Sequence, residues 1–270
     1  MSALAAVVLL VLWMLRPAVS GPEGTPPPRA RPPASEPSPE PLKVEVLAIV
    51  PHDPESYTQG LLWHAGSLYE SGGQYGQSSL RRADLATGEV KQRVEIPGKY
   101  FAEGLALVGD KLIQLTWQEK TAFVYRLSDL QKVGEHRYDG AGWGLCFDGR
   151  RLVMSNGSDT LTFRDPETFA SRGEVRVTRA GVPADRLNEL ECVDGAVWAN
   201  VYLTDEILRI DPETGKVTGT VDASGLLTPA ERADAEVLNG IAYKPDTKTF
   251  LITGKYWPRL FEVRFVPASE

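Results

Sequence analysis

Glu103 is the residue of this chain whose type and place most suggest acid–base chemistry. It lies in "FAEGL", between Ala102 and Gly104, at the start of an apolar run where a plain strand would favour Val or Thr. A single carboxylate in partly apolar surroundings has a raised pKa, and this suits a group that carries protons. The bland alternative is that Glu103 only accepts hydrogen bonds from nearby backbone amides, and its position alone favours neither interpretation.

The sequence lacks the residues that several other kinds of site require. The three histidines, His52, His64 and His136, fall in an expected loop, a hairpin turn and the end of a strand, so a zinc site or a Ser-His-Asp triad has no obvious members. The net charge is −7, and no run of Lys or Arg appears. This argues against nucleic acid as the main partner, because binding phosphates needs clustered basic side chains.

The body of the chain repeats one unit. Each copy opens with a polar or aromatic residue, continues with Gly in four copies and Glu in one, and then has two apolar runs around a turn rich in Gly and Asp. Such a unit is a β-hairpin. The openings are spaced by 44, 40, 45 and 51 residues, and they are Gln59, Glu103, Trp143, Asn188 and Asn239.

The repeat predicts a closed ring of sheets. A third strand follows each hairpin and a fourth follows in the first four copies, which gives four strands per 40 to 50 residues, the period of a propeller blade. The last copy lacks its fourth strand, and residues 42–50 can supply it. We therefore expect an all-β fold, a five-bladed β-propeller closed by an N-terminal strand. The alternative is an all-β sandwich with chance internal similarity. Thr228, Pro229 and Glu231 predict a short helix by their capping box.

In such a propeller the five opening residues form a ring at one mouth of the central channel. Glu103 is the only acid among them, which disfavours a paired-carboxylate glycosidase. Amide and carboxylate oxygens there could hold a structural calcium ion, though one formal charge gives weak affinity. Trp117 and Lys255 end second strands beside this ring, and Tyr202 lies just past the equivalent point of its own unit. Aromatic residues at such a mouth either bind a small group or pack between blades.

The N-terminal part predicts export. Residues 3–15 are apolar and residues 18–20 are small, so residues 1–20 are expected to be a signal peptide, or an anchor if they are retained. Residues 21–41 contain nine prolines and predict an extended linker before a domain at 42–270. The protein would then be periplasmic or secreted, and could be tethered to a membrane only through that N-terminal segment. In an exported chain Cys146 and Cys192 could pair, but their apolar surroundings favour buried free thiols.

Seven motifs occur in order through the domain: "YTQGL", "YESGGQYGQSSLR", "AEGL", "GWGLCFDG", "LNELECVDGAVWANVY", "LNGIAY" and "TGKYWP". They resemble the motifs of the plant and bacterial glutaminyl-peptide cyclotransferases. The resemblance implies a five-bladed propeller. It also implies an enzyme that converts the N-terminal glutaminyl residue of a peptide or protein to pyroglutamate and releases ammonia.

The resemblance also implies roles for residues. Glu103 of "AEGL" matches the family's acid/base residue. Polar residues that match its site are Gln59, Asn188 and Lys255, and those that match its aromatic walls are Phe101, Trp117 and Trp143. We assign catalysis to Glu103, Lys255 and Gln59, and substrate binding to the walls with Asn188, Asn239, Tyr57 and Tyr202. Three positions depart from the usual family pattern, and they put substrate preference in doubt: Tyr57 (usually Phe), Ala102 (usually Gly) and Tyr202 (often Trp).

Two alternatives remain open beside the cyclotransferase. A non-catalytic propeller would be an extracytoplasmic binding module that keeps the ring as structure only. A calcium-dependent hydrolase of the lactonase type would need several axial acids, of which only Glu103 is present in the ring. For the enzyme, we expect a monomer that requires no cofactor.

Overall fold

The computed structural model of the chain describes residues 36–268, and these residues belong to one compact unit. The expected signal peptide or anchor at 1–20 and most of the expected linker at 21–41 lie outside the described residues. Among residues 36–268, no helix has the length and apolar character needed to cross a bilayer.

Three antiparallel sheets of four consecutive strands account for residues 58–176. Their strands are, in chain order, β2 (Thr58–His64), β3 (Ser67–Gly72), β4 (Ser79–Ala83) and β5 (Val90–Glu95); β6 (Ala102–Val108), β7 (Lys111–Thr116), β8 (Thr121–Arg126) and β9 (Lys132–Arg137); and β10 (Leu145–Phe147), β11 (Leu152–Met154), β12 (Thr160–Arg164) and β13 (Ser171–Arg176).

An eight-stranded sheet contains the rest of the repeats, in the order β16-β17-β18-β19-β1-β22-β21-β20. Its strands are β1 (Glu40–Pro51), β16 (Leu187–Val193), β17 (Ala196–Val201), β18 (Glu206–Ile210), β19 (Val217–Asp222), β20 (Leu238–Lys244), β21 (Thr249–Gly254) and β22 (Arg259–Pro267). The β1 strand pairs antiparallel with β22 and, through its first four residues, parallel with β19. The prediction that an N-terminal strand completes the last repeat is therefore confirmed.

Two small elements decorate this frame. The hairpin of β14 (Thr178–Arg179) and β15 (Val182–Pro183) lies between the third and fourth repeats and was not predicted. The helix α1 (Pro229–Asp234) begins at the predicted capping box, in which Thr228 and Glu231 exchange hydrogen bonds.

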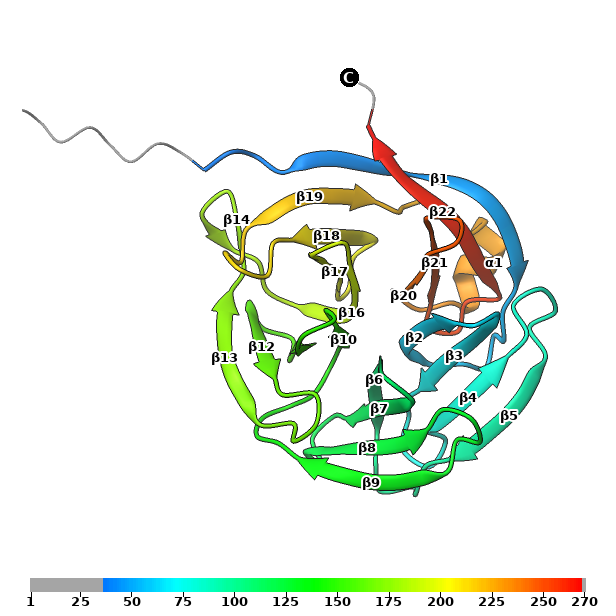
Figure 1. Cartoon of the computed structure of the whole chain (residues 1–270). Coiled ribbons are helices and arrows are strands. Elements are labelled where there is room, and N and C mark those ends of the chain that lie inside the picture. The colour runs from blue at the N-terminus through cyan, green and yellow to red at the C-terminus, as the bar shows by residue number, and fades with distance from the viewer. Residues whose placement is uncertain (1–35, 269–270) are drawn as a thin grey trace, which may run out of the picture. The chain divides into compact units, whose positions relative to one another are not determined.

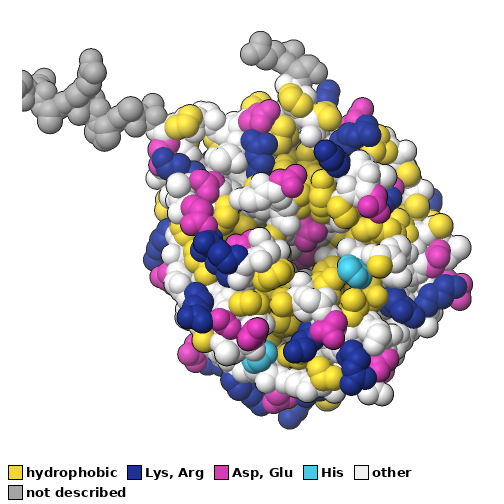
Figure 2. Space-filling model, in the orientation of Figure 1, with side chains coloured by type: hydrophobic (Ala, Val, Ile, Leu, Met, Phe, Trp, Pro, Cys, Tyr) yellow, Lys and Arg dark blue, Asp and Glu magenta, His cyan; other side chains and the backbone are white. Residues whose placement is uncertain are grey.

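The first strands of the repeats surround a common centre (Figure 1). β2 lies against both β6 and β20, β10 lies against β6 and β16, and β16 also lies against β20. On the face drawn in Figure 2 the ring is hollowed at its centre, and Asp or Glu side-chain atoms lie at the floor of the hollow. The fold is all-β and propeller-like.

Burial in the strands follows their place in the ring. Inner and middle strands such as β6 and β7 are mostly buried, whereas outer strands such as β5 and β9 alternate between exposed and half-buried residues. Apolar clusters join neighbouring sheets, and in one of them Leu80 of β4 packs with Leu105 of β6. A side chain at Gly104 would place its Cβ 2.5 Å from the backbone nitrogen of Leu145, so glycine permits the close approach of β6 and β10.

Two expectations from the sequence are wrong. The first strand begins at Glu40 rather than residue 42, because Glu40 and Pro41 at its start still pair with Gly219 and Thr220 of β19. Cys146 and Cys192 are not free thiols. They form a disulfide between β10 and β16, because the ring brings their Cα atoms to 5.5 Å.

Candidate active site

The residues that open the repeats gather where the inner strands begin. Gln59, Glu103, Asn188 and Asn239 are the second residues of β2, β6, β16 and β20, and their exposed fractions are all 4% or less. Trp143 is half-buried and lies just before the short strand β10. Four polar side chains are thus removed from solvent at one end of the inner strands, which is costly unless they have partners or a function.

Glu103 is the least compensated member of this group. Its exposed fraction is 3%, and its Oε2 atom has no hydrogen-bond partner among residues 36–268. Burial raises the pKa of Glu103 well above its usual value; the cation of Lys255 opposes this shift and the carboxylate of Glu119 adds to it. The site therefore holds a carboxyl group that binds a proton more readily than an exposed glutamate does.

Lys255 lies directly after β21, and its exposed fraction is 3%. Its Nζ atom lies 4.5 Å from the ring centre of Tyr57 and 5.1 Å from that of Tyr202, so the ammonium rests between two aromatic faces. Burial lowers the pKa of Lys255 to about 8, although Glu103 and Glu236 act in the opposite direction. Near neutral pH the site thus contains a cation that can lose its proton more easily than an ordinary lysine.

Aromatic rings border these charged groups. Phe101 contacts Tyr57 and Trp117 edge-on, with ring centres 5.9 and 5.8 Å apart. Trp143 contacts Tyr202 edge-on at 5.4 Å. The wall residues predicted from the sequence therefore form two groups of touching rings, and Lys255 contacts Tyr57 in one group and Tyr202 in the other.

The amides of the ring differ in how they are held. The Nδ2 atom of Asn239 donates to the Oε1 atom of Gln59 at 3.1 Å and to the backbone carbonyl of Thr58 at 2.9 Å. The Oδ1 atom of Asn239 is buried and has no partner among the described residues. Asn188 is buried as well, and its backbone carbonyl accepts a hydrogen bond from Ser155. Gln59 and Asn239 thus act as a fixed pair whose unused polar atoms could meet a ligand.

One buried acid next to the ring was missed by the sequence reasoning. Glu189 takes the place that Gly holds in the other repeats, and its exposed fraction is 0%. Its oxygens accept hydrogen bonds from the backbone amides of Leu61 at 3.2 Å and Ile241 at 2.8 Å. Burial, together with Glu191, raises the pKa of Glu189 well above its usual value. The departure from Gly in the repeat was the signal, and the structure shows that this carboxyl links β16 to β2 and β20.

Three further residues near Phe101 and Lys255 were also missed. Glu119 accepts a hydrogen bond from the hydroxyl of Tyr75 at 2.8 Å and one from the backbone amide of Phe101 at 3.3 Å. The ring of Tyr75 packs edge-on against Phe101 at 5.4 Å and remains 47% exposed. Glu236 interacts electrostatically with Lys255. All three lie in loops outside the repeat pattern, so periodicity could not find them.

Comparison with known proteins identifies the family to which this chain belongs. The family model described as glutamine cyclotransferase matches residues 25–265 of the chain. The chain belongs to the glutamine cyclotransferase family. A curated relative from Arabidopsis thaliana, named glutaminyl-peptide cyclotransferase, is 42% identical over 235 residues, which span 84% of this chain and 72% of the relative.

A solved structure supports the same membership. The crystal structure of Myxococcus xanthus glutaminyl cyclase matches with a TM-score of 0.78 and 40% sequence identity, and the match covers 86% of this chain and all of that one. The resemblance inferred from the seven motifs is thereby confirmed.

Proposed function

We propose that this protein is a glutaminyl-peptide cyclotransferase, which closes the N-terminal glutaminyl residue of a peptide or protein to pyroglutamate and releases ammonia. Membership of the family supports the overall reaction. The observation that supports a catalytic site at the ring is the buried Oε2 atom of Glu103, which has no hydrogen-bond partner among residues 36–268 and lies in the electrostatic field of Lys255. A buried polar atom without a partner is costly, and active sites are where such groups are kept.

The reaction needs one proton to move. The α-amine nitrogen of the substrate attacks the side-chain carboxamide carbon of the same residue, forming one C–N bond. The carboxamide C–N bond then breaks, and its nitrogen must gain a proton to leave as ammonia. We assign to Glu103 the transfer of this proton from the attacking amine to the leaving nitrogen, because its raised pKa brings the group closer to the operating pH.

The remaining residues bind and orient. Lys255 offers a cation for the oxyanion that forms on the carboxamide oxygen, and Gln59 offers hydrogen bonds to the carboxamide. Asn188 and Asn239 would fix the amine and the peptide backbone. The rings at the site would hold the flexible glutaminyl side chain folded back on itself, which converts a loose chain into a reactive conformation. These rings are Tyr57, Phe101, Trp117, Trp143 and Tyr202.

We further infer that the propeller has five blades. If the eight-stranded sheet is divided where β19 meets β1, every repeat becomes a four-stranded unit. Each of the five buried apolar clusters found among residues 36–268 then joins two neighbouring units. This agrees with the count of repeats in the sequence.

We also propose that the reaction requires no cofactor. Among residues 36–268, no group of three His, Cys, Asp or Glu side chains is arranged so that it could hold a metal ion. A structural calcium ion held mainly by amide oxygens is the alternative. Full activity after treatment with a chelator would support the proposal, and activity lost on chelation and restored by calcium would contradict it.

Export to the periplasm or outside the cell, a monomeric state and tethering only through residues 1–20 also remain proposals. Export fits the disulfide, because such bonds persist in oxidising compartments. Fractionation of cells and the molar mass in solution would test the location and the monomeric state.

One assay tests the enzymatic function against the alternative of a non-catalytic binding module. The purified protein is incubated with a peptide that begins with Gln and with one that begins with Asn, and both are followed by mass spectrometry. We expect the Gln peptide alone to lose a mass of about 17 Da, that of ammonia, at a rate far above the enzyme-free control. An unchanged Gln peptide would contradict the proposed function.

A further inference from the structure

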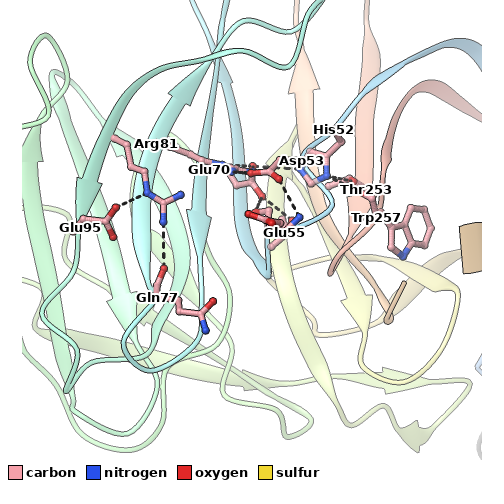
Figure 3. Close-up of polar contacts among 12 residues, drawn as sticks. His52, Asp53, Glu55, Glu70, Gln77, Arg81, Glu95, Thr253 and Trp257 are labelled. Carbon is pink, nitrogen blue, oxygen red and sulfur yellow. Dashed lines mark hydrogen bonds and ion pairs between the residues drawn. The ribbon is translucent and has the colours of Figure 1, made fainter. Parts of the chain in front are cut away.

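A buried charged cluster lies beside the ring, and its centre is Glu70 of β3. Figure 3 shows Glu70 close to Arg81 of β4 and to His52 and Asp53 of the loop after β1. Glu70 is 1% exposed, and its carboxylate takes part in five hydrogen bonds. Such complete satisfaction of one carboxylate makes its position rigid.

The Oε2 atom of Glu70 receives the charged partners. Arg81 donates to it from Nε at 2.9 Å and from Nη2 at 2.7 Å, and the Nε2 atom of His52 lies 3.3 Å away. Although burial alone would raise the pKa of Glu70, Arg81 and His52 hold it well below its usual value. Arg81 is itself held by Asp53 at 2.5 Å. Glu70 therefore stays ionised at the pH values at which proteins normally work.

The Oε1 atom of Glu70 binds the segment that carries Tyr57 and Gln59. It accepts hydrogen bonds from the hydroxyls of Ser56 at 2.5 Å and Thr58 at 2.7 Å. These two residues flank Tyr57, and Thr58 directly precedes Gln59. Glu70 does not belong to the ring of residues that open the repeats. Its carboxylate nevertheless holds the chain on both sides of Tyr57 and directly before Gln59.

The same cluster fixes the segment that carries Lys255. The backbone carbonyl of Ser56 accepts from the amide of Tyr256 at 2.7 Å, and the hydroxyl of Thr58 lies 3.3 Å from the carbonyl of Gly254. The Nδ1 atom of His52 lies 2.7 Å from the carbonyl oxygen of Trp257. Both residues that neighbour Lys255 in the chain are therefore tied to the segment that Glu70 holds.

We propose that Glu70 is a positioning residue of the active site, which acts through the hydroxyls of Ser56 and Thr58 to set Gln59 and Tyr57 relative to Lys255. This inference rests on the proposed function. Its physical basis is that a displacement of about 1 Å in a reacting group can cost about 100-fold in rate. Glu70 acts through these two hydroxyls and not by touching the reacting atoms.

The test removes one hydroxyl and leaves the charges in place. In Thr58→Val the size and shape of the side chain are nearly kept, while Glu70, Arg81 and His52 keep their mutual contacts. We expect kcat on a Gln peptide to fall by about 10- to 100-fold with KM changed by less than about threefold, because orientation rather than uniform binding is lost. Thr58→Ser keeps the hydroxyl and should restore most of kcat.

Thr249→Val is the matched control. Thr249 is 1% exposed, and its hydroxyl donates to the carboxylate of Glu262 at 2.7 Å, as that of Thr58 does to Glu70. It lies at the opposite end of β21 from Gly254. We expect the two valine variants to lose similar stability in urea unfolding, and we expect the control to keep its kcat.

Equal kcat in the two valine variants would overturn the proposal, and so would failure of Thr58→Ser to restore activity. Ser56→Ala removes the other hydroxyl from the same oxygen and gives the same comparison should Thr58→Val not fold. These outcomes differ from failure of the proposed function, in which the unchanged protein itself releases no ammonia from Gln peptides.

Discussion

At the scale of single residues, the site keeps its two main charged groups in unfavourable states. Glu103 is buried with one oxygen that has no hydrogen-bond partner in the described part of the chain, and Lys255 is buried against aromatic faces. Burial raises the pKa of the acid and lowers the pKa of the base, so both shifts move toward neutrality. A carboxyl group with a raised pKa and an amine with a lowered pKa exchange protons more readily than ordinary side chains do, whereas a site built for stability would pair them directly.

Replacing Glu103 by Gln separates activity from stability. We expect ammonia release from Gln peptides to fall by about 100- to 10,000-fold, since the proton carrier is lost. The folded state raises the pKa of this carboxyl, so the native protein holds its proton at pH values where the unfolded chain has lost it, and stability falls as pH rises through that range. At pH 7 the variant should therefore unfold at the same temperature as the unchanged protein or higher.

Glu135→Gln serves as the control for this variant, because Glu135 is a partly exposed acid that pairs with Lys132 on β9. It should keep full activity, as surface ion pairs of this kind contribute little. Near-full activity in Glu103→Gln would show that another group carries the proton.

The pKa of Lys255 predicts how kcat changes at alkaline pH. Its folded pKa is about 8, so the cation is present below that pH and is lost as pH rises through it. If the cation stabilises the oxyanion, kcat should decline with an apparent pKa of about 8. Lys255→Arg keeps the charge at high pH and should remove the decline, whatever its effect on the maximum rate. A decline that persists in the arginine variant would contradict this role.

At the scale of elements, the disulfide joins two neighbouring inner strands. Cys146 of β10 and Cys192 of β16 are separated by 46 residues, so the bond closes a long loop in the unfolded chain. Replacing both by Ser should lower the free energy of unfolding by about 4 kcal/mol, by the chain-entropy estimate for a loop of this length. Urea unfolding with and without a reductant measures this, and the reductant should have no effect on the variant. Equal stability of the two proteins would contradict the prediction.

At the scale of the whole molecule, the N-terminal strand β1 closes the ring. It pairs with β22 along most of its length, and β22 carries the buried residues Leu260, Phe261 and Val263. A chain beginning at Ser35 should fold and stay active, whereas one beginning at Asp53 should lose its cooperative unfolding and aggregate through the uncovered edge of β22. Circular dichroism during heating and gel filtration compare the two chains. Cooperative unfolding of the shorter chain would contradict this role for β1.

Much of the architecture could be predicted from the sequence because it is written as a local, repeated pattern. Alternation of apolar residues, turn residues at fixed intervals and the capping box at Thr228 are each readable within one unit. The unfinished last repeat pointed to β1 as its missing strand. The hairpin of β14 and β15 departs from the repeat, so no period revealed it.

The sequence by itself determined the kind of fold, the family and the residues that open each repeat, among them Glu103. Only the tertiary structure decided that Cys146 and Cys192 pair, that Glu189 bridges two strands and that Glu70 holds the segment before Gln59. The physical reason is that each of these contacts joins groups from different strands or repeats. The distances between these groups depend on how the ring of sheets closes, and residue spacing along the chain does not predict that closure.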